Sequence, residues 1–90
     1  MKNKGFVYIL RSLKNNRFYI GSSNNIETRF NQHQSGYVKA TRYIRPLRLE
    51  LFQEYGSINL ARAIEQKLKN LKRKDYIENI LKDGFIKMGP

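Results

Sequence analysis

The chain has 90 residues, with 18 Lys or Arg, 7 Asp or Glu and a formal charge of +11. This length allows one compact domain, and the hydrophobic content of 40% is too high for a disordered basic tail. The absence of Cys excludes disulfides and thiolate zinc sites, and the single His excludes clusters of several histidines. Any metal is therefore expected to be a hard cation held by oxygen.

The charge is unevenly distributed along the chain. Residues 1–49 contain ten basic residues and one acid, Glu27, whereas the other six acids follow. This favours a polyanion as partner, nucleic acid before an anionic membrane surface, although such charges are also common on solvated surfaces. The longest apolar run, residues 6–10, is too short to span a membrane, and residues 1–5 do not resemble a signal peptide, so we expect a cytoplasmic protein.

The first elements are expected to be a β-hairpin. Residues 6–10 and 17–21 are β-branched and aromatic, and residues 12–16 between them have the composition of a turn.

A helix is predicted next, from a cap at Asn24 or Asn25 to Gln34. Glu27 completes a capping box if Asn24 is the cap. Ile26 and Phe30 lie four residues apart and are expected to face the core.

The middle of the chain predicts a basic loop and a third strand. Residues 36–46 are irregular and rich in cations, of which Lys39, Arg42 and Arg45 are candidate contacts for phosphates. Residues 47–55 alternate as a strand does, and the alternation places Leu47, Leu49 and Leu51 on one face.

Two helices are expected at the end of the chain. After Ser57, an apolar stripe recurs at intervals of three and four residues, formed by Ala61, Ile64, Leu68 and Leu71. Asp75 and Glu78 have the spacing of a capping box for a third helix that ends at Gly84. The predicted fold is α+β, a three-stranded antiparallel sheet flanked by helices in the order β-β-α-β-α-α, over residues 1–84 with residues 85–90 as a tail.

Five side chains are candidates for chemistry. Tyr8 and Tyr19 lie on neighbouring strands, where a tyrosine is usually a half-buried sheet residue. Arg29 and His33 lie four residues apart on one side of the first helix, although a lone histidine is often a surface residue. Glu65 lies at the margin of the apolar stripe, where it suits either an ordinary salt bridge or one Mg²⁺ ion.

In their order and spacing these residues resemble the GIY-YIG nuclease domain, over nearly the whole chain. The two tripeptides are residues 6–8, in which Phe6 replaces the family's glycine, and residues 19–21, Tyr-Ile-Gly. Residues 33–36, His-Gln-Ser-Gly, with the motifs that follow are similar to the small single-domain branch related to the nuclease module of the repair subunit UvrC. A late asparagine of the family matches Asn70 or Asn79 equally well.

The resemblance implies metal-dependent hydrolysis of DNA phosphodiester bonds, with a role in repair or recombination. Tyr8 would be the general base, with its pKa lowered by adjacent cations, and Tyr19 would position the phosphate or the attacking water. Arg29 would bind phosphate oxygens, and His33 would bond Tyr8 or the phosphate. Glu65 would hold a single Mg²⁺ or Mn²⁺.

The sequence alone does not decide which nucleic acid or which protein is the partner. RNA is not excluded as a substrate, and the chain could act with a second copy of itself or with a targeting protein. The alternative to an enzyme is a non-catalytic basic module that binds DNA or RNA by charge alone, for which neutralising Arg42 and Arg45 would matter and changing Tyr8 and Glu65 would not.

Overall fold

A computed structural model describes residues 4–87 and shows an antiparallel sheet of three strands in the order β2-β1-β3. The strands are β1 (Gly5–Ser12), β2 (Phe18–Ser23) and β3 (Leu47–Tyr55). The central strand β1 pairs with β2 through the predicted hairpin and with β3 on its other side. The expected α+β fold and its element order are confirmed.

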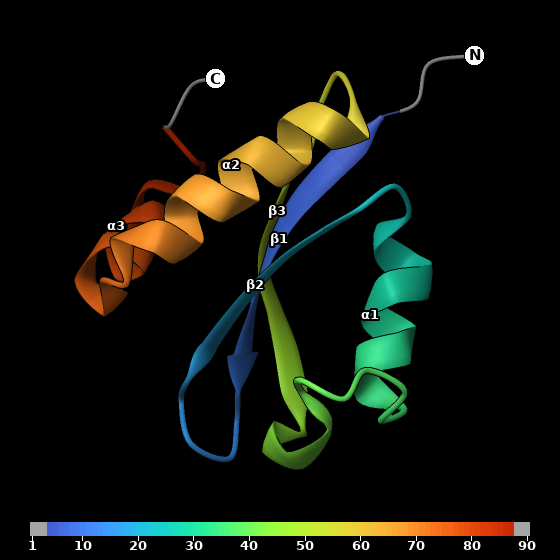
Figure 1. Cartoon of the computed structure of the whole chain (residues 1–90). Helices are drawn as coiled ribbons and strands as arrows, with labels where there is room; N and C mark the ends of the chain where they lie inside the picture. Colours follow the sequence, from blue (N-terminus) through green and yellow to red (C-terminus); the bar gives the residue numbers. More distant parts are fainter. Residues whose placement is uncertain (1–3, 88–90) are drawn as a thin grey trace.

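Helices cover the two faces of this sheet unequally (Figure 1). The short helix α1 (Ile26–Gln34) lies on one face, and α2 (Ile58–Leu71) and α3 (Lys74–Asp83) lie on the other. A 3-10 turn at Arg42–Ile44 interrupts the basic loop before β3. Within residues 4–87, none of the helices has the length and apolarity needed to cross a membrane.

Side-chain caps fix where two of the helices begin. The Asn25 side chain accepts a hydrogen bond from the Thr28 amide at 3.0 Å, so the cap of α1 is Asn25 rather than Asn24. The Ser57 hydroxyl accepts from the Leu60 amide at 3.1 Å at the start of α2.

The predicted capping box of the third helix is wrong. Arg73 occupies the capping position of α3 without a side-chain cap, and Asp75 lies in the first helical turn. There its carboxylate forms an ion pair with Arg73 at 2.6 Å and complements the positive end of the helix dipole.

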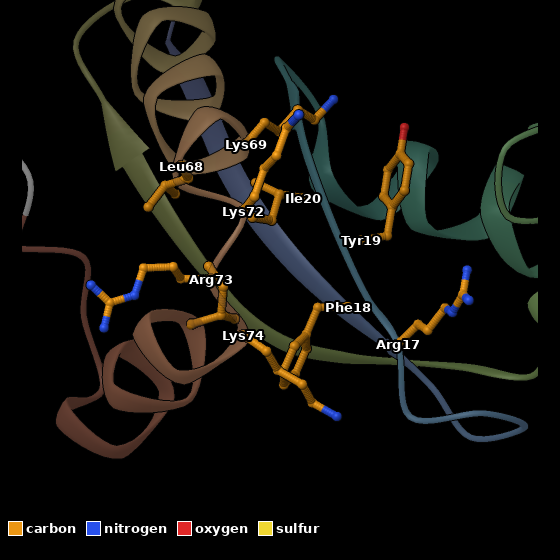
Figure 2. Close-up of a pocket in the computed structure, with 10 residues that line it drawn as sticks. Arg17, Phe18, Tyr19, Ile20, Leu68, Lys69, Lys72, Arg73 and Lys74 are labelled. Atoms are coloured by element: carbon orange, nitrogen blue, oxygen red, sulfur yellow. The ribbon is translucent and has the colours of Figure 1, made fainter.

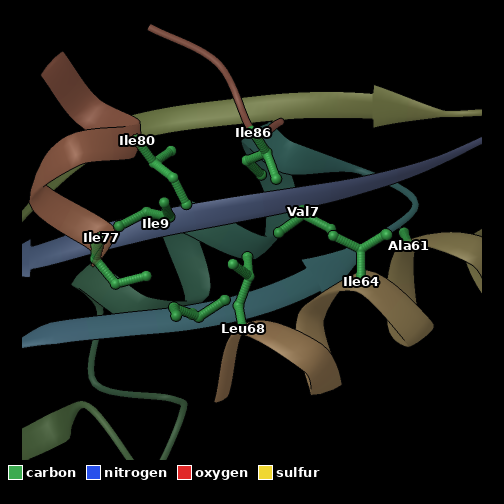
Figure 3. Close-up of a cluster of buried hydrophobic side chains, with 9 residues drawn as sticks. Val7, Ile9, Ala61, Ile64, Leu68, Ile77, Ile80 and Ile86 are labelled. Carbon is green, nitrogen blue, oxygen red and sulfur yellow. The ribbon is translucent and has the colours of Figure 1, made fainter. Parts of the chain in front are cut away.

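The main core lies between the sheet and the α2/α3 pair (Figure 3). Val7 and Ile9 point from β1 toward α2, which contributes a buried stripe consisting of Ala61, Ile64 and Leu68. The predicted stripe is one residue too long, because Leu71 at the end of α2 is 39% exposed.

The three leucines of β3 do not share one face. The pairing of β1 with β3 shifts between Ile9 and Leu10, which face Leu51 and Leu49 respectively. Such an irregularity inserts an extra residue and reverses the alternation beyond it. Leu47 and Leu49 therefore pack on the α1 face, whereas Leu51 packs with the α2/α3 core.

The packed core continues past Gly84. Ile86 is buried, and its backbone N–H and C=O both bond the side chain of Gln53 on β3, at 2.7 and 3.2 Å. This residue falls in the segment that the sequence suggests as a tail, of which residues 88–90 lie outside the described part of the chain.

Candidate active site

A buried tyrosine–histidine pair occupies the α1 face of the sheet. The Tyr8 hydroxyl lies 2.8 Å from His33 Nε2, and both side chains are almost fully buried. The ring of Tyr19 completes an aromatic triangle, with its centroid 5.1 Å from that of His33 and 6.5 Å from that of Tyr8. Three of the predicted residues, from β1, β2 and α1, therefore meet in one cluster.

The register of the hairpin makes room for Tyr8. Gly21 on β2 lies directly opposite Tyr8 on β1, and a Cβ atom at Gly21 would overlap the Tyr8 ring and hydroxyl. The glycine of the second tripeptide is therefore required by the position of the tyrosine of the first.

Thr41 holds the far side of the histidine ring. Its hydroxyl lies 2.7 Å from His33 Nδ1, and the side chain is fully buried although it comes from the basic loop. When Nδ1–H donates to Thr41, Nε2 is left to accept a hydrogen bond from the Tyr8 hydroxyl. This role of Thr41 was not among the predictions; the available signal was that Thr41 is the one Ser or Thr of the basic loop, eight positions after His33.

Arg29 lies one helical turn before His33 on α1 and is half-buried. Its Nη1 donates to Gln32 Oε1 at 3.0 Å, which holds the guanidinium at the margin of the cluster. The positive charge acts on both partners of the buried pair, because it opposes the rise in the pKa of Tyr8 and lowers the pKa of His33.

Burial dominates the electrostatics of the pair. Desolvation raises the pKa of Tyr8 above its usual 10.0, and the hydrogen bond and charge of Arg29 only partly oppose this. Burial, with the charge of Arg29, lowers the pKa of His33 to about 4. The charge of Arg29 alone does not bring the pKa of Tyr8 below its ordinary value, and a lowering by a bound metal ion together with the surrounding cations stays a prediction. Near neutral pH the phenol and the imidazole are both uncharged.

Glu65 lies on the α2 side of β2 and acts on the cluster through its charge. It lies on α2, and its carboxylate accepts a short hydrogen bond from the Ser22 hydroxyl on β2 and pairs with Lys69 Nζ at 2.6 Å. The charge of Glu65 contributes to the raised pKa of Tyr8, and its partner Lys69 has Nζ 5.6 Å from the centroid of the Tyr19 ring. Ser22 and Lys69 were not among the predicted site residues.

A polar hollow of about 450 Å³ opens beside Arg29. It lies between the start of α1 and the first half of α2, and Ser22, Thr28 and Arg62 are among its lining residues. Two arginines and several hydroxyl and amide groups suit an anionic ligand such as a phosphate.

Glu65 could hold a divalent ion only together with ligands other than protein side chains. Residues 4–87 contain no group of three His, Cys, Asp or Glu that could hold an ion by themselves. Mg²⁺ often binds through one or two carboxylates, with waters and substrate phosphate as its other ligands. Glu65 provides such a carboxylate, and an ion there would compete with Lys69 for it.

Two of the predicted cations of the loop hold the loop together. Arg42 Nε donates to the Gly36 carbonyl at 2.8 Å, and Arg45 donates to the carbonyls of Arg42 and Gln34 at 2.9 and 3.2 Å. The side chains of both arginines and of Lys39 are exposed. Neutralising either arginine would therefore also loosen the loop.

Comparison with known proteins identifies the family. The model of the GIY-YIG catalytic domain matches residues 4–79. The chain belongs to the GIY-YIG family. This family is one of nucleases, which supports a nuclease-type function, and its model covers the elements that carry Tyr8, Tyr19, Arg29, His33 and Glu65.

The chain is also similar to several small bacterial proteins. A UPF0213 protein of Klebsiella pneumoniae is 35% identical over 78% of this chain and 66% of its own length. The UPF0213 protein YhbQ of Escherichia coli is 32% identical over 90% of this chain and 80% of its own, and one of Vibrio campbellii is 39% identical over 72% and 62%. The matches thus span slightly under two thirds of two of these relatives. No solved structure matches the chain.

Proposed function

We propose that this GIY-YIG protein is an endonuclease that hydrolyses DNA phosphodiester bonds with one divalent metal ion, in DNA repair or recombination. The observation that carries the proposal is the pair of Tyr8 and His33, 2.8 Å apart, with Arg29 and Glu65 close enough to act on the pKa of the phenol. A domain that binds by charge alone has no need of such a buried pair.

The buried pair supports a two-proton relay for activating water. The attacking water gives a proton to the Tyr8 oxygen while the Tyr8 proton moves to His33 Nε2, so that no free tyrosinate has to form. His33 is neutral near pH 7 and can accept this proton. Thr41 then stabilises the imidazolium by accepting from Nδ1–H.

The groups around the pair suit the charge of a phosphodiester. Arg29 binds the non-bridging oxygens, and the bound anion offsets the guanidinium charge that lowers the pKa of His33, which favours the relay. Tyr19 positions the phosphate or the attacking water. GIY-YIG nucleases typically use divalent metals, and an ion held by Glu65 would stabilise the leaving oxygen.

The exposed cations of the loop support the nucleic-acid part of the proposal. Lys39, Arg42 and Arg45 would contact backbone phosphates, which positions a duplex without reading its sequence.

The test is a cleavage panel of plasmid, single-stranded, flap and branched DNA with Mg²⁺, Mn²⁺ or excess chelator. We expect cleavage only with a metal, and its loss in Glu65→Gln and Arg29→Ala while DNA binding stays within a few-fold. Glu78→Gln is the matched control, because Glu78 is an exposed glutamate of α3.

Two results would contradict the proposal. Full activity in chelator or in Glu65→Gln would exclude the metal role of Glu65. Binding that falls steeply with salt, without cleavage under any metal, would instead identify a non-catalytic nucleic-acid-binding module.

A further inference from the structure

Besides the polar hollow beside Arg29, a second hollow lies along β2 against the junction of α2 and α3 (Figure 2). Its volume of about 380 Å³ is within the range of small-molecule sites. Its apolar lining comes mainly from Phe18, Ile20, Leu68 and Ile77. We call it the β2 groove.

Cations surround the β2 groove, and no acid is among its lining residues. The five basic residues are Arg17, Lys69, Lys72, Arg73 and Lys74. Arg73 is already paired with Asp75, and in Figure 2 its side chain points away from the other four. Arg17, Lys72 and Lys74 form no ion pair within residues 4–87. Three cations are thus available to an anionic ligand beside an apolar surface.

The groove is continuous with the candidate active site. Lys69 Nζ lies 5.6 Å from the centroid of the Tyr19 ring and 2.6 Å from the Glu65 carboxylate, so Lys69 belongs to both places. Tyr19 also lines the groove, although its ring contacts His33 on the other face of the sheet. A nucleic-acid strand that leaves the candidate active site around the edge of β2 would therefore enter the β2 groove.

We propose that the β2 groove binds a single-stranded extension of the nucleic-acid substrate next to the cleaved bond; this rests on the proposed function. Phosphates lie on Arg17, Lys72 and Lys74, and one base packs against Phe18. A base in a duplex is paired and stacked on both sides and cannot enter such a hollow, whereas unpaired bases stack on aromatic side chains. Lys74 Nζ and Arg11 Cζ lie over the Phe18 ring, 5.8 and 4.8 Å from its centroid, so phosphate ligands lie at this ring and the base must pack on the part of it that these cations leave open.

The first arm of the test measures binding in chelator, where no cleavage occurs. The probe is a DNA hairpin with a single-stranded extension that carries 2-aminopurine, whose fluorescence is quenched by stacking. We expect wild type to quench it and Phe18→Leu, which keeps an apolar side chain, to abolish the quenching. In Lys72→Asn/Lys74→Gln we expect affinity to fall at least about fivefold and the salt slope to decrease by about 1.4, since each single-strand phosphate contact contributes about 0.7.

The control removes the same number of charges outside the groove. Lys82 and Lys87 are exposed cations at the end of α3 and beyond it, and neither lines the groove. Lys82→Ala/Lys87→Ala should keep the affinity within twofold. Equal loss of affinity in both double variants, or quenching that persists in Phe18→Leu, would overturn the proposal.

The second arm separates this proposal from the proposed function. With Mg²⁺ or Mn²⁺, wild type should cleave the extended hairpin at least about fivefold faster than a blunt one, and Lys72→Asn/Lys74→Gln should lose only this preference. Cleavage of both substrates at one rate by wild type would refute the groove and leave the nuclease intact. Quenching without any cleavage would support the groove and refute the nuclease.

Discussion

The two faces of the sheet differ in what they bury. The α2/α3 face buries an aliphatic core, with Val7, Ile9 and Leu68 at its centre. The α1 face buries Leu10 and Leu47 and, beside them, a hydrogen-bonded chain of Tyr8, His33 and Thr41, whose burial costs free energy that their hydrogen bonds offset. We infer that the α2/α3 face holds the fold together and that the α1 face carries the chemistry, and the charge of Glu65 on α2 acts on Tyr8 of the α1 face.

The helices match this division. Helix α2 has 14 residues and buries three apolar side chains, whereas α1 has nine residues, of which only His33 is buried. Helix α1 also packs Ile26 and Phe30, both partly buried, against the sheet, and a helix of nine residues depends on such tertiary contacts for its stability. Substitutions on the two faces should therefore separate stability from activity.

The largest effect is expected from Tyr8→Phe, which removes the hydroxyl and keeps the ring. Cleavage should fall by about 10² to 10⁴-fold, the range for a lost acid–base group, while the free energy of unfolding falls by only about 1 kcal/mol. Initial cleavage rates and urea unfolding measure the two quantities. Tyr37→Phe, at a tyrosine that is 73% exposed, is the control and should change neither. If the Tyr8→Phe protein is stable and cleaves at the wild-type rate, the assignment of the reaction to the α1 face is wrong.

Ile80→Ala in α3 is expected to lower stability and to leave the cleavage rate unchanged. Ile80 is buried in the aliphatic core away from the site, so its truncation should lower the free energy of unfolding by about 3 kcal/mol. Leu71→Ala removes a similar side chain that is 39% exposed and should cost much less. Both proteins, assayed at a temperature where they are folded, should cleave at the wild-type rate. Lost activity in folded Ile80→Ala would show that the faces are coupled.

The sequence predicts the packing of the α2/α3 face better than the contacts of the candidate site, for a physical reason. Periodicity and caps are local, so the stripe of α2 and the hairpin could be located from neighbouring residues alone. The shift that separates Leu49 from Leu51 depends on the pairing of β1 with β3, which no local pattern contains. Thr41, Ser22 and Lys69 become site residues only through contacts over 8, 43 and 4 positions with His33 and Glu65.

A third prediction uses His33, the chain's one histidine, as a pH probe of the α1 face. Its native pKa of about 4 lies below the ordinary value of 6.5, so between these values the unfolded state binds more protons. Its contribution to stability is complete above about pH 6.5 and is lost as the pH falls toward about 4, by at most about 3 kcal/mol.

Urea unfolding at about pH 7 and about pH 5 measures this loss. Because carboxylates titrate mainly below this window, His33→Gln should lose clearly less stability than wild type between the two values. Equal losses in the two proteins would mean that folding leaves the pKa of His33 at its ordinary value of 6.5, so that burial does not lower it.

The smallest effect is expected from Thr41→Val, which keeps the shape of the side chain and removes its hydroxyl. His33 Nδ1 then loses its partner at 2.7 Å, at a cost of about 1 kcal/mol in the free energy of unfolding. The tautomer that leaves Nε2 free for Tyr8 is no longer favoured, so cleavage should fall about tenfold, equivalent to about 1.4 kcal/mol. Thr41→Ser restores the hydroxyl and should restore the rate. If Thr41 has only a structural role, the folded Thr41→Val and Thr41→Ser proteins should cleave at the same rate. The pH profile of cleavage distinguishes the two roles, because only a change at His33 shifts the acidic limb of that profile.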